Sequence, residues 1–240
     1  MKQILLTGDS KGVGMTTLKT LLSNGYRVIG ISRSYNSSQQ KVKEEYGDMY
    51  HHIKFDLADS DGIADLYKSK IKKFGKFDGF VNNAAVAYDD IITNMNVTSL
   101  QKMYNVNVIS PMMLVKYMIR NSLLTKSRLN IVHISSISAH TGYKGLAMYA
   151  STKSAMEGFS KNTAREWGTN GVRSNVVCPG FMDTDMSASL TDEQKNRIFN
   201  RNSRKSEITT YDVANTIEFL LSDLSNGITG QIIHVDNGTI

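Results

Sequence analysis

The chain contains very few cysteine, proline and tryptophan residues. Of its 240 residues one is cysteine, two are proline and one is tryptophan. A single cysteine, Cys178, cannot close an internal disulfide, so the composition favours a reducing compartment and we expect a cytoplasmic protein. No apolar run approaches the roughly 20 residues of a membrane-spanning helix, and a strand-like segment begins almost at Met1. We therefore expect no membrane anchor and no signal peptide.

Charge and histidine patterns argue against two further classes. The net charge is +6, from 28 Lys and Arg against 22 Asp and Glu, and the basic residues are spread along the chain. Nucleic-acid binding needs a concentrated basic stripe, so we expect no nucleic-acid partner and only a bias toward phosphate-bearing or acidic partners. The five histidines show no metal-ligand spacing with carboxylates or thiols. The sequence therefore predicts no metal site.

Strand-like and helix-like segments alternate along the whole chain. Short apolar runs predict strands at 4–8, 27–32, 52–56, 77–84, 129–136, 172–180 and 231–236. Helical patterns lie between them, ending near 24 and covering about 37–46, 60–74, 100–124, 148–170 and 211–221. Continuous apolar strands are expected when helices cover both faces of a parallel sheet. The pattern predicts an α/β fold, a doubly wound Rossmann-type parallel sheet, in a single domain spanning 1–240.

A glycine-rich loop, TGDSKGVG at 7–14, follows the first strand. Gly8, Gly12 and Gly14 would let the backbone turn tightly and approach a pyrophosphate, although an ordinary strand-to-helix turn also uses glycines. The helix beginning near Val13 would offer unpaired N–H groups to the phosphates. We expect the whole loop to bind a dinucleotide, with these residues in contact: Gly8, Ser10, Lys11, Gly12, Val13 and Gly14.

The second strand ends in Ser32 and Arg33, where an NAD-specific protein would carry a carboxylate for the ribose hydroxyl. Arg33 together with Lys11 would suit a 2′-phosphate, so we predict NADPH over NADH. The alternative is that Arg33 is a solvated residue beside a strand end. Further cofactor contacts are expected where later strands end. Asp56 and Leu57 would flank the adenine, unless Asp56 only caps a turn, and the fourth strand is followed by Asn83, Ala84 and Ala85.

The reacting group is predicted from Tyr149 and Lys153, one helical turn apart, with Ser136 at the end of the preceding strand. Carbonyl reduction needs a hydride on carbon and a proton on oxygen. A free tyrosine has a pKa of about 10, and a cation such as Lys153 on the same helix face is expected to lower it toward working pH. Ser136 would donate a hydrogen bond to the substrate oxygen. Each could alternatively be a surface or packing residue.

Taken together, these motifs resemble the single-domain short-chain dehydrogenase/reductase family over essentially the whole chain. Within it, stretches 185–194, 212–223 and 228–238 look most like 3-oxoacyl-(acyl carrier protein) reductases. The resemblance implies a sheet of about seven strands and a homo-oligomer, tetramer or dimer. It implies that Lys153 bonds the nicotinamide ribose and that Asn107 anchors a water chain to the lysine. It also implies a carbonyl substrate linked to a carrier protein or CoA, and a place in fatty acid biosynthesis.

The segment after the sixth strand would face the nicotinamide. Pro179 and Gly180 predict a turn there, and the N–H of Phe181 and the hydroxyl of Thr184 could hold the carboxamide. Residues 185–207 are interpreted as a substrate lid, with a short helix starting at a Thr191 capping box closed by Gln194. The lid carries basic residues that either grip an acidic or phosphate-bearing partner or form a solvated face: Arg197, Arg201, Arg204 and Lys205.

Three departures from the resemblance leave the substrate open. Ala85 stands where the family usually has glycine, 202–205 lacks a common Pro-x-x-Arg turn, and Asn170 replaces a frequent basic residue. The leading hypothesis is an NADPH-dependent reductase of 3-oxoacyl thioesters. The second is the same chemistry on a sugar, polyol, steroid or other small ketone or alcohol. The third is a non-catalytic nucleotide-binding sensor, against which the intact Ser136, Tyr149 and Lys153 argue.

Overall fold

A computed structural model describes residues 1–183 and 191–240. In these residues seven strands form one sheet in the order β3-β2-β1-β4-β5-β6-β7, and every neighbouring pair is parallel. The strands are β1 Gln3–Thr7, β2 Arg27–Ser32, β3 Tyr50–Lys54, β4 Gly79–Asn82, β5 Leu129–Ile134, β6 Val172–Pro179 and β7 Ile232–Val235. The doubly wound parallel sheet predicted from the sequence is confirmed.

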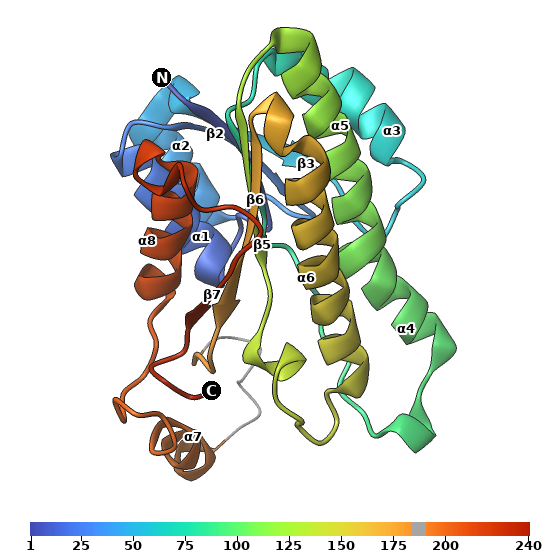
Figure 1. Ribbon diagram of the computed structural model, residues 1–240, viewed down its shortest axis with the longest axis vertical. Helices are drawn as coiled ribbons and strands as arrows, with labels where there is room; N and C mark the ends of the chain where they lie inside the picture. Colours follow the sequence, from blue (N-terminus) through green and yellow to red (C-terminus); the bar gives the residue numbers. More distant parts are fainter. Residues whose placement is uncertain (184–190) are drawn as a thin grey trace.

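Helices cover both faces of this sheet (Figure 1). One face carries α1 (Gly12–Ser23), α2 (Ser37–Tyr46) and α8 (Thr210–Leu221), and the other carries α3 (Ile63–Leu66), α4 (Val97–Tyr104), α5 (Ser110–Thr125) and α6 (Ala147–Trp167). Each layer has its own apolar core. Leu18, Leu21 and Ile217 are fully buried on the first side, and Leu114 and Met118 on the second. Within the described ranges no helix is both long and apolar enough to cross a membrane.

Two predicted helices differ in detail from the observed ones. The stretch predicted at 60–74 is a short α3 followed by a π turn, Tyr67–Ile71, and a 3-10 turn, Lys72–Phe74. The stretch predicted at 100–124 begins at Val97, and a π turn, Asn105–Ile109, separates α4 from α5. Pro111 explains the second irregularity, because it has no N–H to donate to the carbonyl of Asn107 four residues earlier.

The carboxyl ends of the strands meet at one edge of the sheet, the lower edge in Figure 1, on the side of α7 (Asp192–Phe199). Parallel α/β sheets bind ligands in the crevice outside this edge. The three polypeptide turns that matter most leave from it: the loop after β1, the 3-10 turn Ile137–Ala139 after β5, and the Pro179–Gly180 turn after β6. The topology therefore brings segments from the whole length of the chain to one site.

Candidate active site

A cavity of about 1000 Å³ lies at this edge of the sheet. All but two of the residues expected from the sequence line it: Gly8, Ser10, Lys11, Gly12, Val13, Gly14, Ser32, Arg33, Asp56, Leu57, Asn83, Ala84, Ala85, Ser136, Tyr149, Lys153, Pro179, Gly180 and Phe181. The two exceptions differ in kind. Asn107 is buried behind the cavity wall, and Thr184 lies outside the residues that the structure describes.

The glycine loop forms a close-packed backbone cradle. A Cβ on Gly14 would lie 1.9 Å from the carbonyl oxygen of Gly8, so the start of α1 packs against the end of β1 only with glycine here. Gly12 has φ of +54°, and a Cβ there would meet nothing within 4 Å, so its backbone opens toward the cavity. Gly14 therefore serves close packing, while Gly12 serves the approach of a ligand to the backbone.

This cradle fits a pyrophosphate. In α1, which is described throughout, no acidic residue occupies the first turn and no side chain caps it. Its first N–H groups and the positive end of the helix dipole are thus available to an anion. The exposed Lys11 precedes the helix and lines the same cavity. The loop residues are those that would hold the phosphates of a dinucleotide.

The loop is fastened to β4 by hydrogen bonds that the sequence did not predict. The Thr7 hydroxyl accepts from the backbone N–H groups of Asn83 and Ala84, each at 3.1 Å. The Asn83 side chain in turn donates to the carbonyl oxygens of Thr7 and Gly8, at 3.1 and 3.2 Å. Asn83 therefore shapes the loop in addition to lining the cavity. Thr7 is a positioning residue whose only sequence signal was its place at a strand end.

The expected ribose corner combines one buried and two exposed groups. Ser32 is nearly buried, and its hydroxyl donates to the carbonyl of Ser34 at 3.0 Å and lies 2.9 Å from Nε2 of His52. Arg33 and Lys11 are exposed and line the cavity, as a 2′-phosphate site requires. The Ser32 hydroxyl thus stabilises the backbone at the end of β2, while Arg33 and Lys11 line the cavity.

The expected adenine corner lies two residues beyond β3. Asp56 is exposed and its carboxylate accepts from the N–H of Ala58 at 3.0 Å, so it stabilises a turn while also lining the cavity. Leu57 is buried, and its carbonyl accepts from the hydroxyl of Ser110 at 2.7 Å. Both roles considered for Asp56, turn cap and cavity wall, are present in the same residue.

Tyr149, Lys153 and Ser136 all line the cavity. Lys153 is buried on α6, and its Nζ donates to the carbonyl of Ile134 at 2.8 Å and lies 5.5 Å from the centre of the Tyr149 ring. Ser136 lies two residues beyond the end of β5, and its Oγ accepts from the N–H of Ser138 at 3.2 Å. The carbonyl at the end of β5 thus orients the ammonium toward the phenol, and the hydroxyl group of Ser136 starts from the same strand end.

Burial changes the expected ionisation of this pair. The pKa of Tyr149 is raised, first by burial and then by the negative charge of Asp89 and the nearby Cys178. Burial lowers the pKa of Lys153 to about 8. The expectation that Lys153 lowers the pKa of the phenol is therefore wrong for the protein's own groups, because burial penalises the phenolate and is the largest cause of the raised pKa. Tyr149 is held as a protonated acid, which is the form that donates to a carbonyl oxygen.

Asn107 sits in the π turn and braces the active-site wall. Its Nδ2 donates to the carbonyl of Val86 at 2.9 Å and to the hydroxyl of Thr152 at 3.0 Å, and its Oδ1 accepts from the N–H of Val86 at 2.9 Å. Thr152 also donates to the carbonyl of Tyr149. The side chain therefore joins the loop after β4 to the second turn of α6. The expected role of Asn107 in a water chain to Lys153 stays a prediction.

The turn after β6 and the following helix form the remaining wall. A Cβ on Gly180 would lie 2.5 Å from Ile208 and 2.9 Å from the backbone of Asp236, so only glycine fits. Phe181 contacts Phe199 of α7, with ring centres 5.5 Å apart. This contact ties the Pro179–Gly180 turn to the segment that the sequence identified as a lid.

The described part of the lid is α7 and the chain that follows it. The carbonyl of Thr191 accepts from the N–H of Lys195, as at a helix start, while the side chain of Gln194 lies outside the description. Arg197 pairs with Glu193 on the same helix at 2.6 Å, both exposed. The other three basic residues expected to meet a partner are exposed: Arg201, Arg204 and Lys205. Arg197 thus belongs to a solvated face. For the other three residues, both binding of an acidic or phosphate-bearing partner and a solvated face stay as alternatives.

The chain matches known proteins over nearly its whole length. A family model described as enoyl-(acyl carrier protein) reductase matches residues 8–239. The 3-oxoacyl-[acyl-carrier-protein] reductase FabG of Escherichia coli is 32% identical over 99% of this chain and 96% of its own, and that of Haemophilus influenzae is 33% identical over 99% and 97%. A structure of ElxO with NADP bound has a TM-score of 0.89 at 30% identity, covering 99% of this chain and 98% of its own.

The protein is an oxidoreductase with a Rossmann-type fold, and one cavity contains the residues expected to bind the cofactor and to donate a proton. More narrowly, the chain belongs to the short-chain dehydrogenase/reductase family. A structure of 4-hydroxyisoleucine dehydrogenase with NADH has a TM-score of 0.93 at 23% identity, which shows the shared fold alone.

Proposed function

We propose that this enzyme reduces the carbonyl of a 3-oxoacyl thioester to the 3-hydroxyacyl form with NADPH. The observation that carries the proposal is that Ser136, Tyr149 and Lys153 line the same cavity as the glycine loop. The FabG relatives, matched end to end at about a third identity, are named as reductases of 3-oxoacyl groups on acyl carrier protein.

The chain's own residues supply the proton and the charge stabilisation. When bound, the reduced nicotinamide supplies the hydride for the carbonyl carbon. Tyr149 gives its phenolic proton to the carbonyl oxygen, and Ser136 stabilises the developing negative charge by donating a hydrogen bond. Lys153, as an ammonium, stabilises the phenolate that is left and then helps its reprotonation through the nearby Asn107 carbonyl and water.

Preference for NADPH is proposed from the ribose corner. Arg33 and Lys11 both face the cavity, and no carboxylate stands at position 33 to repel a 2′-phosphate. ElxO, at 30% identity, is a relative whose structure holds NADP. Arg33→Asp should reverse the preference, with the ratio of kcat/KM for NADPH over NADH falling by about 100-fold or more. An unchanged ratio would contradict the role of Arg33, and Arg120→Asp, outside the cavity lining, is the control.

A thioester on a carrier or on CoA is proposed as the substrate. The exposed Arg201, Arg204 and Lys205 suit the phosphate of a pantetheine arm or an acidic carrier protein. Residues 202–206, where the Pro-x-x-Arg turn is missing, are instead tied to the C-terminal segment. The Asn202 carboxamide accepts from the hydroxyl of Thr239 at 2.9 Å, and Ser203 donates to the carbonyl of Gly238 at 2.8 Å. Fatty acid biosynthesis is the corresponding pathway.

The test is a substrate panel run with both nicotinamide cofactors. NADPH oxidation is followed with acetoacetyl-CoA, acetoacetyl carrier protein, a set of sugars, polyols, cyclic ketones and steroids, and crotonyl-CoA as the enoyl substrate that the matched family description suggests. We expect the acetoacetyl thioesters to give kcat/KM at least tenfold above every other compound. A higher value for a small ketone would replace the substrate while keeping the chemistry. Tight NADPH binding without turnover of any compound would overturn the proposal in favour of a sensor.

A further inference from the structure

Cys178 and His234 are direct neighbours in the sheet. They face each other in the parallel register of β6 and β7, so their side chains project from the same face. That face is the one covered by α6, because Ser174, four residues before Cys178 on β6, bonds Ser160 of α6 at 2.8 Å. The thiol of Cys178 is fully buried, while the imidazole of His234 on the edge strand is exposed.

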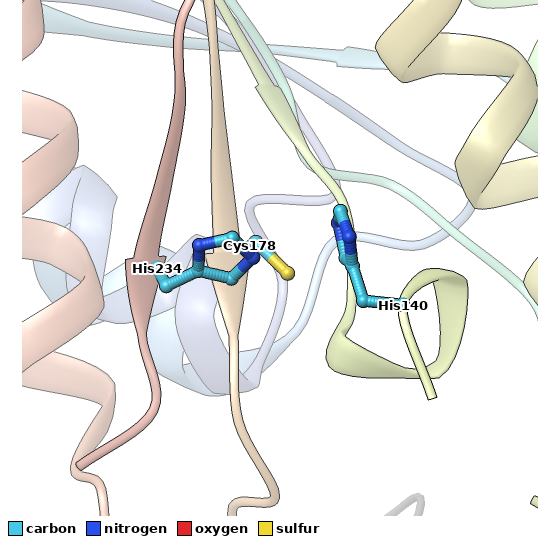
Figure 2. Close-up of side chains that lie close together, drawn as sticks. All are labelled: His140, Cys178 and His234. Atoms are coloured by element: carbon cyan, nitrogen blue, oxygen red, sulfur yellow. The ribbon is translucent and has the colours of Figure 1, made fainter. Parts of the chain in front are cut away.

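A third metal-binding side chain reaches the pair from the turn after β5. His140 follows the 3-10 turn Ile137–Ala139, and its ring lies 4.8 Å, centre to centre, from that of His234. One ligand atom each from His140, Cys178 and His234 can be chosen so that all three lie within 4.8 Å of one another. Figure 2 shows the sulfur between the two imidazoles, pointing toward His140.

The surroundings of this cluster suit a cation. Glu157 on α6 lies with Oε1 2.9 Å from Nε2 of His140 and also accepts from the hydroxyl of Ser135. A carboxylate beside an imidazole ligand either orients the ring or completes the coordination in metal sites. His140 and His234 are exposed, while Cys178 between them is buried.

The reaction mechanism makes no use of the Cys178 thiol. Burial and the charges of Glu157 and Asp236 raise the pKa of Cys178 to about 12, with Lys153 acting in the opposite direction. The thiol is therefore protonated near neutral pH and is a poor nucleophile. A bound metal ion replaces that proton: the sulfur becomes a thiolate ligand and one proton leaves to solvent.

We propose that His140, Cys178 and His234 form a binding site for a thiophilic divalent cation, Zn²⁺ in particular. Zn²⁺ takes nitrogen and sulfur ligands at about 2.0 to 2.3 Å, so ligand atoms in a tetrahedral site lie roughly 3.3 to 3.8 Å apart. The ligand atoms lie within 4.8 Å of one another, so metal binding requires His140 and His234, the two exposed members of the group, to move closer. Two histidines and a cysteine leave a fourth position for Glu157 or water.

A metal ion in this site would stabilise the edge of the sheet formed by the carboxyl ends of its strands, next to the active site. Cys178 directly precedes Pro179, which lines the cofactor cavity, and His140 lies four residues after Ser136. A bound ion would thus join β6, β7 and the turn after β5, three segments that are far apart in sequence. We expect Zn²⁺ at about 100 times its Kd to raise the Tm by roughly 5 °C or more.

Cobalt spectroscopy tests the site without any measurement of turnover. Metal-stripped wild-type protein is titrated with Co²⁺, a spectroscopic substitute for Zn²⁺. Thiolate ligation gives an intense sulfur-to-cobalt charge-transfer band in the near ultraviolet, which histidine or surface carboxylate sites do not give. Because Cys178 is the only cysteine of the chain, the band reports on this residue alone. We expect one Co²⁺ per chain, displaced by one equivalent of Zn²⁺.

Three variants and a control separate this site from adventitious binding. Cys178→Ser should abolish the band, and His140→Gln and His234→Gln should each weaken Zn²⁺ binding at least tenfold and remove the Tm shift. His51→Gln, which changes a histidine on β3, should leave the band, the Zn²⁺ affinity and the Tm shift unchanged. Absence of the band at saturating Co²⁺, or Zn²⁺ affinity unchanged in Cys178→Ser, would overturn the proposal. Should Cys178→Ser fail to fold, the wild-type band decides by itself.

Discussion

Tyr149 and Lys153 show how one helical turn can make an acid whose ionisation depends on burial. The two side chains are four residues apart on α6, and the ammonium lies 5.5 Å from the ring centre. Burial raises the pKa of the phenol and lowers the pKa of the ammonium, because each loses hydration. In the proposed reduction, the pair therefore starts with the proton on the phenolic oxygen.

Removing the phenolic hydroxyl of Tyr149 should abolish most of the carbonyl reduction and leave NADPH binding unchanged. Tyr149→Phe is expected to lower kcat by about 10³-fold, because general-acid catalysis of this kind contributes 10² to 10⁴. The Kd for NADPH, measured by fluorescence titration, should change less than threefold. Tyr143→Phe, an exposed tyrosine of the same cavity, is the control. Substantial turnover by Tyr149→Phe would show that another group donates the proton.

The pH dependence of reduction should follow Lys153. Its pKa of about 8 means that the ammonium is present below pH 8 and is lost above it, whereas the raised pKa of Tyr149 keeps the phenol protonated over the same range. Because kcat/KM reports the ionisation of the free enzyme, it should be level at low pH and fall about tenfold per unit above roughly pH 8. A profile that stays level to about pH 10 would contradict this assignment.

At the scale of elements, the connection from β1 to α1 carries the nucleotide function and depends on glycine for two separate reasons. Gly14 lies against the backbone of Gly8, while Gly12 has a left-handed φ and faces open space. Thr7 and Asn83 then fasten this turn to the end of β4. The cradle is thus held by the sheet on one side and presents its backbone on the other.

Adding a methyl group at Gly14 should damage this cradle. Gly14→Ala is expected to weaken NADPH binding at least tenfold, because its Cβ would lie 1.9 Å from the Gly8 oxygen and the loop must shift. Gly158→Ala is the matched control. Gly158 is exposed within α6 and a Cβ there meets nothing within 4 Å, so alanine should raise the unfolding free energy by about 0.5 to 1 kcal/mol. Equal NADPH affinity in both variants would contradict the packing argument.

Comparison of predicted and observed helix boundaries shows which local sequence signals predict where a helix starts and ends. The helix α2 starts and ends at Ser37 and Tyr46 as predicted, because Asn36 and Gln39 form a capping box at its start. The long helix predicted at 100–124 missed the π turn, although Pro111 was visible in the sequence. A missing N–H can kink, end or bulge a helix, and the packing of Asn107 against Val86 and Thr152 selects the bulge here.

At the scale of the whole molecule, one exposed apolar segment precedes α4. Ile91, Ile92, Met95 and Val97 are 42%, 69%, 43% and 59% exposed. Four large apolar side chains within seven residues are more than the scattered exposure of a monomer surface requires. This segment supports the expectation of a homo-oligomer, tetramer or dimer.

Light scattering should give a mass that is a multiple of 26.7 kDa at micromolar concentration. Ile92→Asp combined with Val97→Asp is expected to lower that mass, because it places charges on the apolar segment. Leu224→Asp serves as the control, since Leu224 is 84% exposed in a different part of the surface. A wild-type protein that is monomeric at these concentrations would contradict the expectation.

The sequence by itself determined the order of strands and helices, the glycine cradle and the Tyr149–Lys153 pair. These features depend on signals within one turn or one strand, namely apolar periodicity, glycine spacing and residues at strand ends. The tertiary structure alone decided the ionisation of that pair and the meeting of His140, Cys178 and His234, which lie 38 and 56 positions apart. Burial and strand register depend on distant parts of the chain packing together, so no local pattern records them.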